Sequence, residues 1–213
     1  MASLIKRVML KQCETKHKTV SFENNALYHN SLSIPLNHLI DLTNGDGDDQ
    51  RVGDEVIGKY IKFKLWFASK FDRPNVKIRV MVLRVPINEH TGVISPFNND
   101  HGNKLLDYIN TEKYTPVYQK FININTNTAI GPDSGLPPPS TGYDWNLKER
   151  SVMHSFTIPL KDEKIKFLEG ENRPKFQKFN LRFVAVAYDA YGTATTDNIA
   201  SYAGNYRFYY KDP

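Results

Sequence analysis

The sequence lacks the usual marks of a secreted or membrane protein. Its 213 residues include one cysteine, Cys13, which excludes an intrachain disulfide. There is no Asn-x-Ser/Thr acceptor, and no apolar run approaches the roughly 18 residues of a spanning helix. Lys6, Arg7 and Lys11 interrupt the start too early for the apolar region of a secretory signal. We therefore expect a protein that stays in a reducing compartment, without an export signal or membrane insertion.

Signatures of catalysis and of metal binding are also lacking. The six histidines are scattered, with none at the spacing of a metalloprotease helix. Gly53 to Lys59 has the spacing of a phosphate-binding loop, but Tyr60 follows where the motif needs Ser or Thr. Residues 44–55 have acidic or amide side chains at several calcium-loop positions, yet Asp49 occupies the turn position that needs Gly. We interpret this segment as an acidic turn, with calcium at a subunit boundary as the alternative, and expect no enzyme, cofactor or resident metal.

What the sequence has is alternation of apolar and polar residues, the period of a half-buried strand. It predicts one all-β domain, an antiparallel sandwich of eight strands with long loops, for which we favour a jelly roll. Residues 183–187 are apolar on both faces, which indicates a central strand. The turn at residues 71–75 indicates that the strands before and after it are adjacent. The expected strands are 61–67, 76–82, 117–124, 152–160, 183–187 and 202–210, with weaker candidates at 16–22 and 32–42.

The remaining segments read as one short helix, loops and a basic terminus. Asn103 to Ile109 is the helix candidate, with Asn103 as its N-cap. Residues 125–147 are too polar and proline-rich to pair as strands, so we expect a long loop at a functional surface. The expected organisation is a basic N-terminal segment, residues 1–13, followed by the jelly-roll domain, residues 14–213.

The positive charge is concentrated at one end of the chain. The net charge is +5, and residues 1–20 hold five cations against Glu14 alone. A basic end on a nearly neutral body suits a polyanion, nucleic acid first and an anionic membrane second; a solvated terminus is the alternative. The predicted nucleic-acid-binding residues in this segment are Lys6, Arg7, Lys11, Lys16 and Lys18. Replacing all five by Gln should then flatten the salt dependence of DNA binding.

Two mixtures of aromatic and basic residues are further candidates, one at residues 62–66 and one at residues 206–211. Aromatic faces stack bases while cations contact phosphates, which is how single strands are held without sequence preference. We predict that Lys62, Lys64 and Trp66 bind nucleic acid. The alternative is an ordinary charged sheet surface over an apolar core, which explains Trp66 least well.

The order of the segments resembles the single jelly-roll capsid proteins of circular single-stranded DNA viruses, the circovirus-like group. The likeness covers roughly residues 14–211 and rests on no single specific motif. It begins with Gln50-Arg-Val-Gly-Asp-Glu-Val-Ile57 leading into a basic and apolar strand, and continues through Val76 to Arg84. The other matching segments are 106–109, 114–121, 179–188 and 202–211.

This resemblance implies a virion shell of 60 identical subunits around a circular single-stranded DNA genome, without catalysis. Its partners would be further copies of the chain, the genome and an unspecified host-cell attachment factor, with assembly in the host nucleus or cytoplasm. The basic residues of the first 20 would face the interior, and the loops 86–113 and 125–147 would lie at subunit contacts or on the outer surface.

The chain departs from that family in its first 20 residues, which hold one arginine in place of a long arginine-rich arm. Sixty copies at +5 carry +300, less than half the charge of the 639 nucleotides that encode 213 residues. Other cations, an arm absent from this sequence or empty shells are the alternatives. A different class of function also stays open, a monomeric β-sandwich that binds carbohydrate or single-stranded nucleic acid through an exposed aromatic groove at Trp66 or Trp145.

Overall fold

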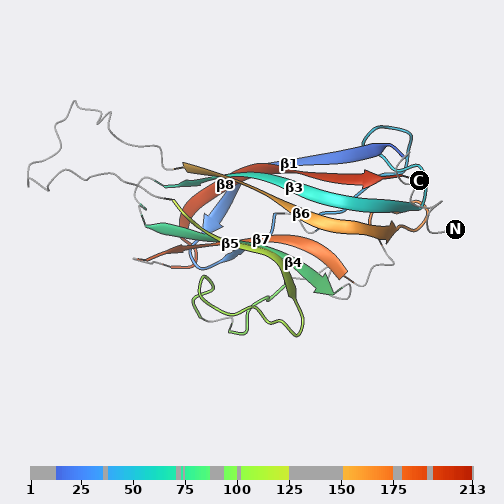
Figure 1. The fold of residues 1–213 in the computed structure, drawn as a ribbon. Helices are drawn as coiled ribbons and strands as arrows, with labels where there is room; N and C mark the ends of the chain where they lie inside the picture. Colours follow the sequence, from blue (N-terminus) through green and yellow to red (C-terminus); the bar gives the residue numbers. More distant parts are fainter. Residues whose placement is uncertain are drawn as a thin grey trace, which may run out of the picture.

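The computed structural model contains eight antiparallel strands, which confirms the predicted all-β class (Figure 1). It describes residues 13–35, 38–70, 73, 75–86, 94–99, 102–124, 151–174, 179–190 and 194–212. The basic residues Lys6, Arg7 and Lys11 and the loop 125–147 lie outside this part. The strands are β1 (Thr15–Tyr28), β2 (Leu32–Ser33), β3 (Glu55–Ser69), β4 (Val76–Pro86), β5 (Thr115–Asn123), β6 (Ser151–Lys166), β7 (Phe179–Asp189) and β8 (Asn198–Lys211).

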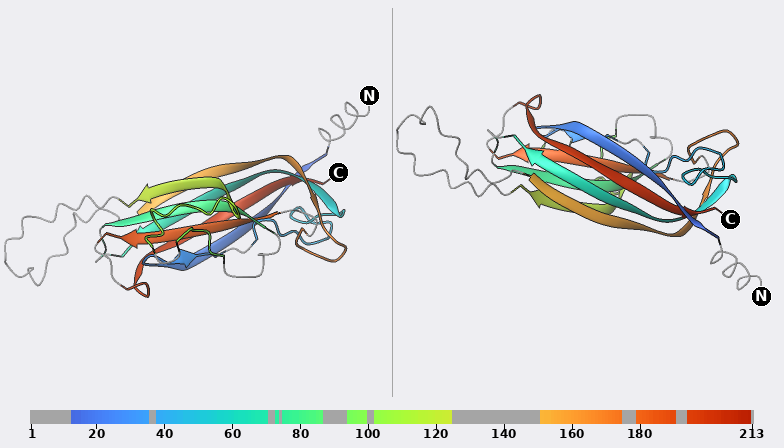
Figure 2. Two further views of the ribbon diagram at one scale, coloured as in Figure 1. Left: turned by 90° about the horizontal axis from the view of Figure 1, so that it is seen from below. Right: turned by 90° about the horizontal axis from the view of Figure 1, so that it is seen from above.

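The strand order is that of a jelly roll. One sheet has the order β1-β8-β3-β6 and the other β2-β7-β4-β5, and the two stack as layers of a sandwich (Figures 1 and 2). The first strand pairs with the eighth, the second with the seventh, the third with the sixth and the fourth with the fifth. The chain is thus one long antiparallel hairpin rolled up until β8 meets β3 and β7 meets β4.

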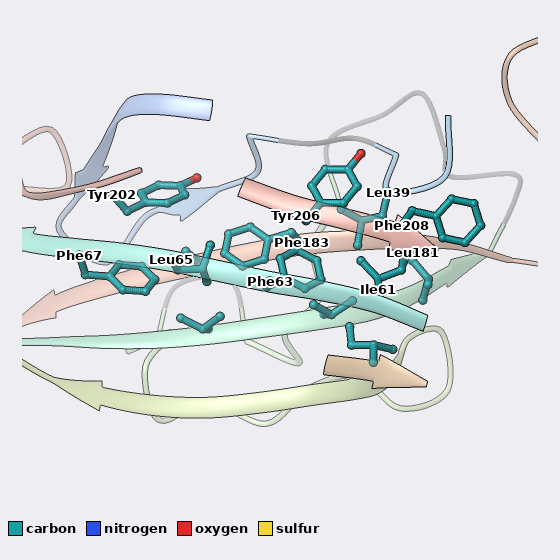
Figure 3. Close-up of a cluster of buried hydrophobic side chains, with 14 of the residues drawn as sticks. Leu39, Ile61, Phe63, Leu65, Phe67, Leu181, Phe183, Tyr202, Tyr206 and Phe208 are labelled. Carbon is teal, nitrogen blue, oxygen red and sulfur yellow. The ribbon is translucent and has the colours of Figure 1, made fainter. Parts of the chain in front are cut away.

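Alternation along β3 builds the core between the sheets. Its inward residues Ile61, Phe63, Leu65 and Phe67 are almost completely buried. The Phe63 ring lies 5.8 Å from that of Phe183 in the opposite sheet. Figure 3 shows these side chains between the strands with Tyr202, Tyr206 and Phe208 of β8. Since burying one large apolar side chain contributes about 1.5–3 kcal/mol, this cluster holds the layers together.

A second apolar cluster covers the outer face of the β2-β7-β4-β5 sheet. Met81, Leu83 and Val85 of β4 point away from the main core and pack against residues of the β4–β5 connection. That connection lies beneath the sheet in Figure 1. β7 lies between β2 and β4 and is buried on both faces, which confirms the central position predicted for residues 183–187. The contacting residues of the connection are Ile94, Phe97, Ile109 and Tyr114.

The prediction that the strands on either side of residues 71–75 are adjacent is wrong. β3 and β4 belong to different sheets, so the chain passes from one layer to the other between them. Their apolar faces meet across the core, and the two strands do not pair with each other through backbone hydrogen bonds. The alternation of apolar and polar residues shows which face of each strand is buried. The same alternation occurs whether two strands pair in one sheet or face each other in opposite sheets, so it does not tell the two arrangements apart.

The short helix predicted at residues 103–109 is also wrong, because the described residues there form turns with no helix. Asn103 does make the side-chain bond expected of an N-cap, since its Oδ1 accepts a hydrogen bond from the Leu105 N–H at 2.9 Å. The buried Arg79 side chain then takes the next carbonyls: its Nη1 donates to the oxygens of Lys104, Leu105 and Asp107 at 3.0, 3.2 and 2.6 Å. Those carbonyls are the acceptors that further helical turns would need. Within the described part of the chain, no helix long and apolar enough to cross a membrane was found.

Candidate nucleic-acid interface

The outer face of the β1-β8-β3-β6 sheet carries the candidate site. Lys62, Lys64 and Trp66 alternate with the buried residues of β3 and are all exposed, Trp66 by 45%. In the right-hand view of Figure 2, looking onto this sheet, no coloured loop crosses its middle. We call this surface the basic face. It consists of Tyr60, Lys62, Lys64 and Trp66 of β3, Met153 of β6, Arg207 and Tyr209 of β8 and His17 of β1.

Strand register concentrates three cations in two adjacent rows of the basic face. Lys62 lies opposite Arg207 of β8, and Lys64 one row further along lies opposite Asn205. Neighbouring strands are about 4.8 Å apart and successive rows about 6.8 Å apart. Arg207 is held toward β1, because its Nε donates to Thr19 Oγ1 at 2.9 Å. The result is a compact positive centre built from two strands.

Aromatic and apolar side chains lie at both ends of this positive centre. Beyond Lys62, the rings of Tyr60 and Tyr209 have centroids 4.4 Å apart, and His17 lies 5.7 Å from Tyr209. Beyond Lys64, Trp66 lies opposite Met153, which is 77% exposed. Ring faces next to cations provide the two elements that hold a single nucleic-acid strand.

Acidic residues are absent from the rows that contain Tyr60 to Trp66, among the described residues that pair there. The partners are neutral or basic, and several offer hydroxyl or amide groups that can bond phosphate or sugar oxygens. Among these paired residues no carboxylate opposes the field of Lys62, Lys64 and Arg207; Glu23, exposed in the β1 bulge between Phe22 and Asn25, is an acidic residue outside the paired rows. The partners are Met153, Ser155, Thr157 and Pro159 on β6, Ala203, Asn205, Arg207 and Tyr209 on β8, and His17, Thr19 and Ser21 on β1.

Lys16 and Lys18 lie apart from the basic face. They alternate with His17 on β1 and so point to the other side of that strand, toward the loop before β3. Lys18 Nζ lies 2.9 Å from Asp49 Oδ2, and the bond lowers the pKa of Asp49 below its ordinary value. Lys16 Nζ lies 3.6 Å from Asp212 Oδ2 and donates to the Gln50 carbonyl at 3.3 Å. The structure therefore brings Lys62, Lys64 and Trp66 together and places Lys16 and Lys18 in ion pairs elsewhere.

Sequence reasoning missed Tyr60, and it named Arg207 and Tyr209 only as part of the separate candidate at residues 206–211, not as members of one site with Lys62. The signal for Arg207 and Tyr209 was present, because alternation puts Tyr206, Phe208 and Tyr210 on the opposite, buried face. The alternation could not provide the strand register that places Arg207 beside Lys62, which lies 145 positions earlier in the sequence. That pairing is a property of the sheet.

The side chains whose pKa values are shifted lie outside the basic face. Burial raises the pKa values of Tyr202, Tyr206 and Tyr210 well above the ordinary range, as expected for phenols within a core. Burial and the nearby charge of Lys120 lower the pKa of His154. Among the residues that the structure describes, no group of three or more His, Cys, Asp or Glu side chains is placed to hold a metal ion.

Comparison with protein-family models finds none that matches this chain, and comparison with curated proteins finds no match.

Proposed function

We propose that this protein is a viral capsid protein, of which 60 copies assemble into an icosahedral shell around a circular single-stranded DNA genome. The observation that carries the proposal is the basic face, an aromatic-flanked surface on one sheet of a jelly roll, in which the residues paired with Lys62 and Lys64 include no carboxylate. Viral coat domains are among the proteins built on this fold, though lectins and cupins share it. The fold alone is therefore a weaker argument than the surface it presents.

The arrangement of the two sheets suits a shell subunit. The β1-β8-β3-β6 sheet exposes cations and ring faces, which fit an enclosed nucleic acid. The other sheet is covered by residues 94–99 and 102–114, which keeps its apolar face from water. In the proposed shell the basic face points inward, with Lys6, Arg7 and Lys11 adding charge from the N-terminal segment. The protein has no catalytic role in this proposal, and it acts in the virion and, during assembly, in the host nucleus or cytoplasm.

Negative-stain electron microscopy of the purified protein tests the proposal, with absorbance at 260 and 280 nm read on the same sample. We expect closed, uniform shells, and an absorbance ratio raised by nucleic acid if the basic face binds it in the shell. Shells without nucleic acid would keep the capsid role and remove the packaging role. Small single particles at every salt concentration and pH tested would refute the proposal.

A second candidate is a monomeric module that binds carbohydrate or single-stranded nucleic acid. The half-exposed Trp66 ring beside Met153 favours it, because an exposed ring face binds sugars as well as bases. Trp145, the other tryptophan considered for this role, lies outside the described residues. Micromolar glycan binding by a monomer that is lost in Trp66→Ala would support this candidate against the capsid.

A further inference from the structure

Three large apolar side chains stand exposed on the side of the molecule opposite the basic face. Leu106 is 72% exposed, Tyr108 80% and Phe121 47%. We call them the apolar patch. Leu106 and Tyr108 belong to the connection that covers the second sheet, below β4 and β5 in Figure 1, and Phe121 lies on β5.

Arg79 organises the apolar patch. It is 3% exposed, and its Nη1 binds carbonyls on both sides of Leu106. Its guanidinium carbon lies 5.5 Å from the centre of the Phe121 ring, and Phe121 is its cross-strand neighbour. Asp107 Oδ1 accepts from the Tyr108 N–H at 2.8 Å. The backbone that carries Leu106 and Tyr108 is therefore held in place, which lowers the entropy cost of docking.

Basic residues predominate at the rim of the apolar patch. Lys77 is exposed and lies two residues before Arg79 on the same outer side of β4. Lys104 and Lys113 belong to the connection itself. Lys104 Nζ donates to the Asn30 carbonyl at 3.2 Å, and Asp107 accepts from the N–H groups of Asn99 and Tyr108. The rim residues Lys77, Lys104 and Lys113 thus outnumber the acidic residues of residues 104–113, Asp107 and Glu112, by three to two.

A surface of the opposite character lies at the end of the sandwich near the C-terminus (Figures 1 and 2). Residues 44–54, which we call the acidic loop, expose Val52 by 59% and also expose Asp46 and Asp48. This loop is fixed by a second buried arginine: Arg51 is fully buried, stacks 4.5 Å from the Phe167 ring centre and donates to the Glu171 carbonyl at 2.9 Å.

We infer that the apolar patch is a subunit contact that docks on the acidic loop of a second copy of this chain. An apolar residue with an acidic rim complements an apolar centre with a basic rim. The two surfaces lie on different sides of one molecule, so the contact is heterologous, and a heterologous contact whose rotation closes builds a ring. This inference rests on the proposed capsid function and adds the surfaces through which its copies meet.

The area agrees with an interface between copies. With about 150–250 Å² for each aromatic side chain, the patch offers on the order of 350 Å² of apolar surface. A standard interface buries about 800 Å² per partner, a little over half of it apolar. The patch thus supplies most of the apolar part on its own side of the contact and its charged rim supplies polar area, whereas on the facing side Val52 is the exposed large apolar residue and the remaining area is polar.

The test compares two variants of the full chain by sedimentation velocity over a range of protein concentrations. We expect the double variant Leu106→Ser with Tyr108→Ser to raise the concentration needed for assembly at least about ten-fold. The matched control is Tyr28→Ser, because Tyr28 is an exposed aromatic residue that belongs to none of the apolar patch, the acidic loop and the basic face. Circular dichroism and thermal melting verify that both variants are folded. Unchanged assembly of the folded double variant would overturn the inference.

Charge reversal supplies an independent test. Asp46→Lys and Lys77→Glu should each weaken assembly, and the chain carrying both should recover it, because each contact joins an acidic loop to a neighbour's patch. No recovery in the double reversal, with both single variants folded, would also overturn the inference. If the unmodified protein forms no particles at all, the capsid proposal itself fails. Particles that form equally well in every variant refute only this choice of surfaces.

Discussion

The sharpest prediction concerns the three cations at the centre of the basic face. In the triple variant Lys62→Gln, Lys64→Gln, Arg207→Gln, the side chains keep much of their length and lose their charge. All three residues are exposed, so the fold should be unaffected. If each contacts one phosphate, the slope of log affinity against log salt should become shallower by about 0.7 per residue, or about 2 in total. Between about 50 and about 200 mM salt, the wild-type protein should lose roughly 18-fold more affinity than the variant.

Fluorescence anisotropy of a labelled oligothymidylate, titrated with full-length protein at several salt concentrations, measures both slopes. The matched control is Lys16→Gln with Lys18→Gln, which removes cations already paired with Asp212 and Asp49. We expect a slope change below about 0.7 for the control. Equal slopes for the wild-type protein and the triple variant would refute the assignment of the basic face to nucleic acid. A larger change in the control than in the triple variant would move the site to the N-terminal strand.

Four further outcomes are expected. Trp66→Ala should weaken oligonucleotide binding by about 1–3 kcal/mol if a base stacks there, and Trp66 fluorescence that does not respond to DNA would contradict stacking. Arg79→Met should lower the free energy of unfolding in urea by roughly 3 kcal/mol, because it leaves buried carbonyls without donors; a loss under about 1 kcal/mol would contradict the role we give to Arg79. Gly204→Ala should lower the free energy of unfolding by about 2 kcal/mol, since a Cβ there would lie 2.6 Å from the Lys64 carbonyl oxygen. The control Gly53→Ala, whose Cβ would have its nearest atom at 3.9 Å, should change it by less than about 0.5 kcal/mol. The lowered pKa of His154 means that the unfolded chain binds a proton at a pH where the folded protein does not, so the free energy of unfolding should fall as the pH drops below about 6.5. Urea titrations at about pH 7 and pH 5 should show a smaller pH dependence for His154→Gln than for the wild-type protein. An identical dependence in both proteins would exclude His154 as its source.

Much of the fold was predictable because side-chain direction in a strand is a local property. Alternation in residues 61–67 predicted which side chains of β3 would enter the core, and the same pattern put Lys62, Lys64 and Trp66 together on its other face. The apolar run at residues 183–187 predicted a central strand for the same reason. The weak first segment proved longer than expected, since β1 runs from Thr15 to Tyr28 and is interrupted by Asn24 with a positive φ of 54°.

The failed predictions share a cause, which is contact between distant residues. Local spacing favoured a helix at residues 103–109, but Arg79, 25 positions before Lys104, captures the carbonyls that a helix would use. A short turn favoured a hairpin at residues 71–75, but sandwich closure placed its two strands in opposite layers. Distant contact also sets the surroundings of Lys18, whose neighbours in sequence are basic but whose partner in space is Asp49, 31 positions away; its nucleic-acid-binding role stays a prediction.

The sequence by itself determined the all-β class, the buried face of the main strands and the outward direction of Lys62, Lys64 and Trp66, because a period of two needs no knowledge of partners. Only the tertiary structure decided the register that adds Arg207 to those residues, the ion pairs of Lys16 and Lys18, and the loops held by Arg51 and Arg79. These features arise from hydrogen bonds and packing between segments far apart in the chain. Such contacts depend on how the eight strands arrange into two sheets, and no local pattern of residues predicts that arrangement.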